Sequence, residues 1–114
     1  MNEENAQPQF NLITCVVQRG RGDNIGKAAI AAGAGGATIF FARGMGLRER
    51  LGLLGLAIVP EKEVIVIVTQ KDETKRIFEV ITKAGKLTTP GMGIAYVTPL
   101  IDVVGLVPHK TSPQ

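Results

Sequence analysis

Residues 61–86 read EKEVIVIVTQKDETKRIFEVITKAGK, and this stretch decides the fold. Its first part, residues 61–70, holds five consecutive apolar β-branched residues between charged flanks, which predicts a buried central strand. Its second part predicts an amphipathic helix that Asp72 can cap and Gly85 can end. The apolar stripe of this helix contains Ile77, Val80, Ile81 and Ala84.

The N-terminal part of the chain shows the same alternation. Residues 11–19 (NLITCVVQR) predict a strand, and residues 37–44 (ATIFFARG) predict another. Between them, IGKAAIAAGA predicts a helix that Asp23 or Asn24 can cap and that the glycines at 33, 35 and 36 end. Residues 94–100 (IAYVTPL) predict the last strand. The order is that of an α+β fold, the ferredoxin-like βαββαβ sandwich, with both helices on one face of a four-stranded antiparallel sheet.

The remaining segments fit a single domain. A chain of 114 residues is long enough for one core and too short for two. We expect a flexible tail over residues 1–9, the domain over residues 10–107 and a second tail over residues 108–114. Residues 44–60, with four glycines and the charged group RER, predict a partly mobile loop between two strands.

The central strand is apolar on both faces, which bears on assembly. Val64, Val66 and Val68 alternate with Ile65 and Ile67, and neither set is polar. Because the helices cover only one face, a monomer would expose the other set. The sequence therefore predicts an oligomer in which this face is covered by copies of the chain.

Composition excludes several classes of protein. The apolar runs are shorter than the roughly 18 residues that a membrane span needs, and the polar start MNEENAQPQ predicts no secretory signal, so we expect a cytoplasmic protein. Cys15 is the single cysteine, and alternation places it in the core; with His109 as the single histidine, no metal site is expected. The net charge of +3 comes from scattered basic residues and only five aromatics are present, so nucleic acid is not an expected partner.

Three loops carry residue types that bind anions. Residues 18–26, QRGRGDNIG, have the glycines of a phosphate loop ahead of a helix, but they lack the Walker spacing, and plain turn glycines are the stronger interpretation. TTPGMG at residues 88–93 follows two lysines, Lys83 and Lys86, and LRER at residues 47–50 places two arginines in a loop. Each of these loops is also explained as a solvated turn. No nucleophile and base lie in an obvious pair, so an enzyme is not expected.

The stretches TIFFARGMG, PEKEVIVIVTQKDETKRIFEVI and PGMGIAYVTPLIDVVGL resemble the PII signal-transduction superfamily over about residues 10–107. The resemblance implies a homotrimer with adenine-nucleotide sites, for ATP, ADP or AMP, in the clefts between subunits. It implies no cofactor or metal. It also implies that the chain regulates a partner protein through the long T-loop, and a membrane transporter is the expected partner.

The resemblance also implies site residues. Gly44 and Gly46 match the start of the T-loop, Val16 and Ile67 match positions that face the base, and Gly91, Met92 and Gly93 match the phosphate-binding B-loop. Gly36, Ala37 and Thr38 match the segment that contacts a neighbour's nucleotide. Further phosphate or partner contacts are expected from Arg43, Arg48, Arg50 and Lys86.

The chain departs from the nitrogen-sensing members of that superfamily. A T-loop glutamine needed for magnesium and 2-oxoglutarate is matched by Arg48, the B-loop lysine by Ile94, and two C-terminal arginines by Gly105 and Val107. The single tyrosine, Tyr96, lies in a predicted strand, so tyrosine uridylylation is not expected. The chain thus resembles the PII-like subgroup. Two alternatives share the fold: a trimeric protein of the divalent-cation tolerance family, and a small acylphosphatase-type hydrolase that would use Arg19 or Arg21.

Overall fold

The strand expected from residues 61–70 is β3 (Glu61–Gln70), one of the two central strands of a four-stranded sheet with the order β2-β3-β1-β4. The computed structural model describes residues 9–44 and 61–106. β1 (Phe10–Gln18) pairs antiparallel with β3 and with β4 (Gly93–Leu100), and β2 (Thr38–Arg43) is the edge strand beside β3. This topology confirms the predicted ferredoxin-like fold.

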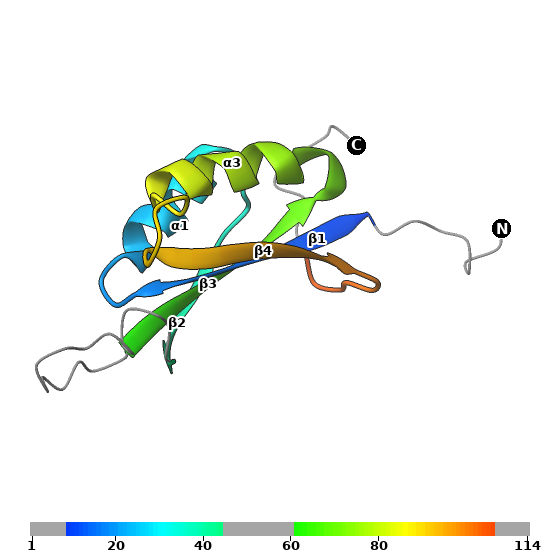
Figure 1. Ribbon diagram of the computed structural model, residues 1–114. Coiled ribbons are helices and arrows are strands. Elements are labelled where there is room, and N and C mark those ends of the chain that lie inside the picture. The colour runs from blue at the N-terminus through cyan, green and yellow to red at the C-terminus, as the bar shows by residue number, and fades with distance from the viewer. Residues whose placement is uncertain (1–8, 45–60, 107–114) are drawn as a thin grey trace, which may run out of the picture.

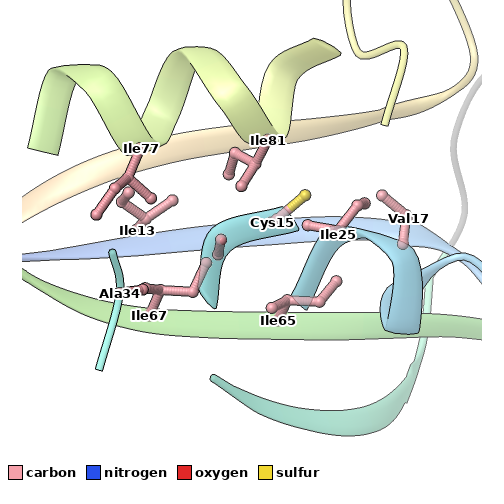
Figure 2. Close-up of a cluster of buried hydrophobic side chains, with 10 residues drawn as sticks. Ile13, Cys15, Val17, Ile25, Ala34, Ile65, Ile67, Ile77 and Ile81 are labelled. Atoms are coloured by element: carbon pink, nitrogen blue, oxygen red, sulfur yellow. The ribbon is translucent and has the colours of Figure 1, made fainter. Parts of the chain in front are cut away.

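Two α-helices cover one face of the sheet (Figure 1). α1 (Gly22–Ala31) follows β1, and α3 (Thr74–Ala84) follows β3 after the short 3₁₀ turn η3 (Lys71–Glu73). The side chains between the helices and the sheet form a buried apolar cluster: Ile13, Cys15, Val17, Ile25, Ala29, Ala34, Ile65, Ile67, Ile77 and Ile81 (Figure 2). Cys15 lies in this core as predicted, and burial raises the pKa of its thiol to about 11.

The starts of both helices differ from the prediction. α1 begins at Gly22, with Arg21 rather than Asp23 or Asn24 at the N-cap and no side-chain cap from that residue. The acceptor comes from β3: the N–H of Gly22 donates to Oε1 of Glu63 at 2.7 Å. α3 is not capped by Asp72, because residues 71–73 form η3 and Glu73 is the N-cap residue without a capping bond.

The ends of both helices are set by glycine, as the sequence indicates. Gly33 adopts a φ of +114° after α1, and the N–H of Ala34 reaches back to the carbonyl of Ala29. Gly85 is the C-cap of α3, and the left-handed residue is the next one, Lys86, with a φ of +53°.

Among the described residues, no helix covers the second face of the sheet, and this face is apolar, as expected from the alternation in β3. Val64 and Val66 lie opposite Phe40 and Thr38 of β2 and opposite Val16 and Thr14 of β1. On the edge strands, Phe40, Ile94 and Tyr96 are 47%, 60% and 46% exposed. We call the side chains of Val16, Phe40, Val66, Ile94 and Tyr96 the open face.

Candidate functional site

Several of the predicted site residues lie at the same end of the sheet, on different strands. β1 and β2 end there and β3 and β4 begin there, because neighbouring strands are antiparallel. Gly44 follows β2 at one edge, and Gly93 opens β4 at the other edge. Three strand spacings separate the two edges, or roughly 14 Å. We call this end of the sheet the glycine end.

The loop that leads into β4 is a series of tight turns. The N–H of Thr89 donates to the carbonyl of Lys86 at 3.0 Å, and the N–H of Met92 donates to the carbonyl of Thr89 at 3.2 Å. Gly91 and Gly93 have φ values of +86° and +141°, conformations that favour glycine. The N–H groups of Thr89 and Met92 are used within these turns. Glycine-rich turns can in addition present neighbouring N–H groups to a phosphate oxygen.

Gly93 also brings the loop against β1. A Cβ atom at Gly93 would lie 2.5 Å from the carbonyl oxygen of Val16, so only glycine permits this approach. The structure therefore places Val16 beside the glycine-rich loop, although the two are far apart in the sequence.

Ile67 does not join Val16. The register pairs Val16 with Val64 and Ile13 with Ile67, and so places Val16 and Ile67 on opposite faces of the sheet. The side chain of Ile67 is 0% exposed and points into the core beneath the helices (Figure 2). The expectation that both side chains face one base is therefore wrong for Ile67.

Gly36, Ala37 and Thr38 lie away from the glycine end. Thr38 is the first residue of β2, and Arg43 is its last residue, at the glycine end. Five residues of extended strand separate them by roughly 17 Å. One chain therefore presents two separate groups of predicted site residues, and it does not bring them together.

Arg43 lines a hollow at the glycine end. The hollow has a volume of about 480 Å³ and is bounded by Arg19, Phe41, Ala42, Arg43 and Glu61. Arg19 forms an ion pair with Glu61, and its guanidinium lies 6.0 Å from the centre of the Phe41 ring. The sequence analysis did not assign Phe41 to the site, although its side chain is 72% exposed. The available signal was an aromatic residue two positions before Arg43, on the same face of β2.

The loop after β1 is occupied by the protein's own groups. The N–H groups of Gly20 and Gly22 donate to the two carboxylate oxygens of Glu63 at 3.0 and 2.7 Å, and Nη2 of Arg21 donates to the carbonyl of Gly85 at 3.2 Å. A carboxylate therefore holds the donors that a phosphate would need. This arrangement speaks against a phosphate-binding role for residues 18–26, and with it against the acylphosphatase alternative.

Some predicted residues lie outside the described part of the chain. These are Gly46, Arg48 and Arg50, together with the rest of the expected loop. Over residues 9–44 and 61–106, no group of three or more His, Cys, Asp or Glu side chains is placed to hold a metal ion. In the same residues, no helix has the length and hydropathy to cross a membrane.

Comparison with known proteins identifies a family and similar solved structures. Residues 10–110 match the family described as nitrogen regulatory protein P-II. Among solved structures, the chain is similar to Arabidopsis thaliana PII bound to citrate, with a TM-score of 0.63 and 20% sequence identity over 87% of this chain and 85% of that one. A search of curated proteins found no match.

Proposed function

Because this chain belongs to the nitrogen regulatory protein P-II family, whose members are signalling proteins, we propose that it binds an adenine nucleotide between subunits and regulates a protein partner. The nucleotide is ATP, ADP or AMP, and the unit that binds it is a homotrimer. No cofactor or metal takes part, and the chain performs no catalysis of its own.

The separation of the two groups of site residues is the observation that carries this proposal. Gly44, Val16 and Gly91–Gly93 lie at the glycine end, and Gly36–Thr38 lie at the start of β2, at the opposite end of that strand. A nucleotide that contacts both groups needs a second copy of the chain, placed with its Gly36–Thr38 segment against the first copy's glycine end. A site between subunits meets this requirement.

The open face supports the assembly. Partly exposed valine, isoleucine and aromatic side chains run across all four strands, a surface that soluble monomers seldom leave uncovered. Closed symmetry around one axis buries the same face of each copy. Three copies would then create three equivalent clefts.

Within each cleft, the backbone of Gly91, Met92 and Gly93 would hold the phosphates, and Val16 and Gly44 would lie near the base. Arg43 would add a cation from the hollow beside Gly44. Gly36, Ala37 and Thr38 would come from the neighbouring subunit. Ile67 takes no part, because it belongs to the core.

The regulatory output would come from the T-loop, residues 45–56, with Arg48 and Arg50 as contacts to the partner. We propose a membrane transporter as that partner, approached from the cytoplasm. A nucleotide acts as a signal here only if it binds one arrangement of this loop better than another. Arg48, in place of the family's glutamine, removes a ligand for magnesium and 2-oxoglutarate, so that metabolite is not the signal.

Calorimetric titration tests the proposal. We expect ATP, ADP or AMP to bind with one site per chain, with no added effect of 2-oxoglutarate, and light scattering to give three times the chain mass. The Arabidopsis protein is bound to citrate, so citrate is included as a competing anion. If no adenine nucleotide produces heat, the nucleotide proposal is wrong.

Three matched variants locate the site. Gly20, Gly91 and Gly105 each have a φ between +86° and +97°, and a Cβ at each would meet nothing within 4 Å. Alanine at each position therefore introduces similar strain without a clash. We expect Gly91→Ala to weaken nucleotide binding about tenfold or more, from the loss of at least one charge-assisted N–H contact, and the other two to leave it unchanged. Loss of binding in Gly20→Ala alone would move the site to the loop after β1.

A further inference from the structure

The loop after β1 is bonded both to β3 and to the end of α3. The N–H groups of Gly20 and Gly22 donate to the two carboxylate oxygens of Glu63, at 3.0 and 2.7 Å. The side chain of Arg21, between these two glycines, donates through Nη2 to the carbonyl oxygen of Gly85 at 3.2 Å. The loop therefore connects a carboxylate on β3 with the C-cap residue of α3.

The contact between Glu63 and the loop depends on a close approach. Glu63 is 9% exposed, and a Cβ atom at Gly22 would lie 2.5 Å from its Oε1. A side chain at position 22 would therefore displace the carboxylate. A Cβ at Gly20, by contrast, would meet nothing within 4 Å.

The contact continues from Gly85 toward β4 through Leu87. A Cβ at Gly85 would lie 3.1 Å from Cγ of Leu87, and a Cβ at Gly93 would lie 3.3 Å from Cδ2 of the same leucine. Leu87 packs against the buried core, and its N–H donates to the carbonyl of Thr82 at 2.9 Å. Because Leu87 lies against both glycines, a shift of Gly85 changes the packing at the start of β4.

The guanidinium of Arg21 is incompletely paired. Among the residues that the structure describes, none accepts a hydrogen bond from its buried Nε. A buried donor without an acceptor destabilises the folded state, so a single bond to a backbone carbonyl does not explain an arginine here on grounds of stability. An unpaired buried polar group of this kind points to a role in function.

We propose that Arg21 is a positioning residue for the loop over residues 86–92, and that Glu63 holds Arg21 in place. The inference rests on the proposed function, in which the backbone of Gly91–Gly93 binds the phosphates. Glu63 lies two strands from β4 in the order β2-β3-β1-β4, or roughly 10 Å away. Nucleotide affinity thus depends on a carboxylate outside the site, and by linkage a bound nucleotide stabilises the contacts of that carboxylate.

Calorimetric titration of the full chain with ADP tests Arg21. Arg21→Met keeps an apolar stem and removes the donor, and it is expected to weaken ADP binding about tenfold because the loop is less preorganised. Arg21→Lys restores a donor for the Gly85 carbonyl and is expected to stay within about threefold of wild type. Lys27→Gln, on the exposed side of α1, removes a charge and should change nothing. Wild-type affinity in Arg21→Met, or equal weakening by Lys27→Gln, overturns the proposal.

Two glycine variants and a double-mutant cycle test Glu63. Gly22→Ala displaces the carboxylate and is expected to weaken ADP binding about tenfold, whereas Gly20→Ala keeps its N–H and should bind as wild type does. If Glu63 acts through Arg21, Glu63→Gln weakens binding in wild type and adds little to Arg21→Met. Full additivity in the double variant contradicts the positioning role.

Amide hydrogen exchange in the free protein separates this proposal from the proposed function, because it needs no nucleotide. Arg21→Met and Gly22→Ala are expected to speed exchange at the amides of Leu87, Thr89 and Met92, which are the donors of the turns after α3. Residues 12–16 of β1 should keep their wild-type rates, which a general loss of stability would not allow. Unchanged exchange at the three loop amides overturns the positioning role. If these amides respond and wild type binds no nucleotide, the proposed function is what fails.

Discussion

Gly93 shows how closely one residue can tie a loop to a sheet. A Cβ at this position would lie 2.5 Å from the carbonyl oxygen of Val16 and 2.9 Å from Cγ1 of Val17, and its φ of +141° is unsuited to other residues. Gly91, two residues earlier, also has a positive φ but faces open space. The two glycines of one short motif therefore have different reasons to be glycine.

This difference predicts unequal costs for the same substitution. Gly91→Ala is expected to lower the free energy of unfolding by about 1–2 kcal/mol, from backbone strain alone. Gly93→Ala adds two collisions with β1 and is expected to cost about 3 kcal/mol or more. Urea denaturation of both variants measures this, and equal losses would contradict the close contact with Val16.

Cys15 predicts a pH dependence of stability. Its pKa rises from 9.0 to about 11 on burial, so the folded chain holds the thiol proton more tightly than the unfolded chain does. Stability from this group is fully present below about pH 9 and is lost as pH rises toward 11, by on the order of 2–3 kcal/mol. Urea denaturation of wild type and Cys15→Ala between pH 8 and 11 isolates the effect. Parallel pH profiles would show that the thiol does not contribute.

At the residue scale, alternation in the sequence predicted the burial of Cys15 but not the place of Ile67. Which face a strand residue takes depends on its register with neighbouring strands, and register is set by pairing across the sheet. Val16 lies on the same face of the sheet as Val64 because the two residues are directly opposite each other in the β1–β3 ladder. Matching by position to a family gives no such pairing, so Ile67 was assigned to the wrong face.

At the scale of elements, the helix ends were predictable and the helix starts were not. Gly33 acts through its own backbone, and Gly85 marks the last turn of α3 although the left-handed residue is the next one, Lys86, so the local sequence reveals both ends. The start of α1 depends on Glu63, whose carboxylate arrives from a strand about 40 residues later in the chain. A local search for a capping side chain therefore selected Asp23 or Asn24, which lie inside the helix.

Glu63→Ala tests the remote cap. Removing the carboxylate leaves the N–H groups of Gly20 and Gly22 without their acceptor, which is expected to cost about 2–4 kcal/mol. Glu61→Ala is the matched control, because its ion pair with Arg19 is exposed and is expected to contribute less than about 1 kcal/mol. Chemical denaturation measures the free energy of unfolding of both variants. Similar losses for the two variants would mean that Glu63 does not hold the start of α1.

Lys86→Gly tests the strained end of α3. Glycine relieves the left-handed conformation at the position where helices favour it, so this variant is expected to gain about 1 kcal/mol of stability. Lys83→Gly, inside α3, is the control and should lose about 1 kcal/mol. Thermal denaturation distinguishes the two. A loss of stability in Lys86→Gly would show that the conformation carries no strain.

At the scale of the whole molecule, the sequence predicted the architecture better than the site. The periodicities of strands and helices are local, and they were sufficient for the chain order of the elements and for the fold class. The proposed site draws on more than one chain, since its two groups of residues lie apart in one copy. Apolar alternation on both faces of β3 was the single sequence signal for that assembly.

Ile94→Lys tests the assembly. Ile94 is 60% exposed on the open face, and a buried charge there is expected to shift the mass in sedimentation from three chains toward one. Ile30→Lys is the control, since Ile30 is 53% exposed on α1, away from the sheet, and should leave the mass unchanged. An unchanged mass for Ile94→Lys would exclude the open face as the interface.

The pairing of β1 with β3 has a consequence for the time in which the chain folds. The partners in this central ladder are distant in sequence, from Gln18 with Lys62 to Phe10 with Gln70, so the core cannot form from neighbouring segments. Mixed α/β topologies with such non-local pairing fold more slowly than helical bundles and faster than all-β sandwiches. Lengthening residues 44–60 changes this little, because doubling a loop adds only about 0.6 kcal/mol of closure entropy. The segment between β2 and β3 is thus open to variation in length, while the pairing of β1 with β3 is not.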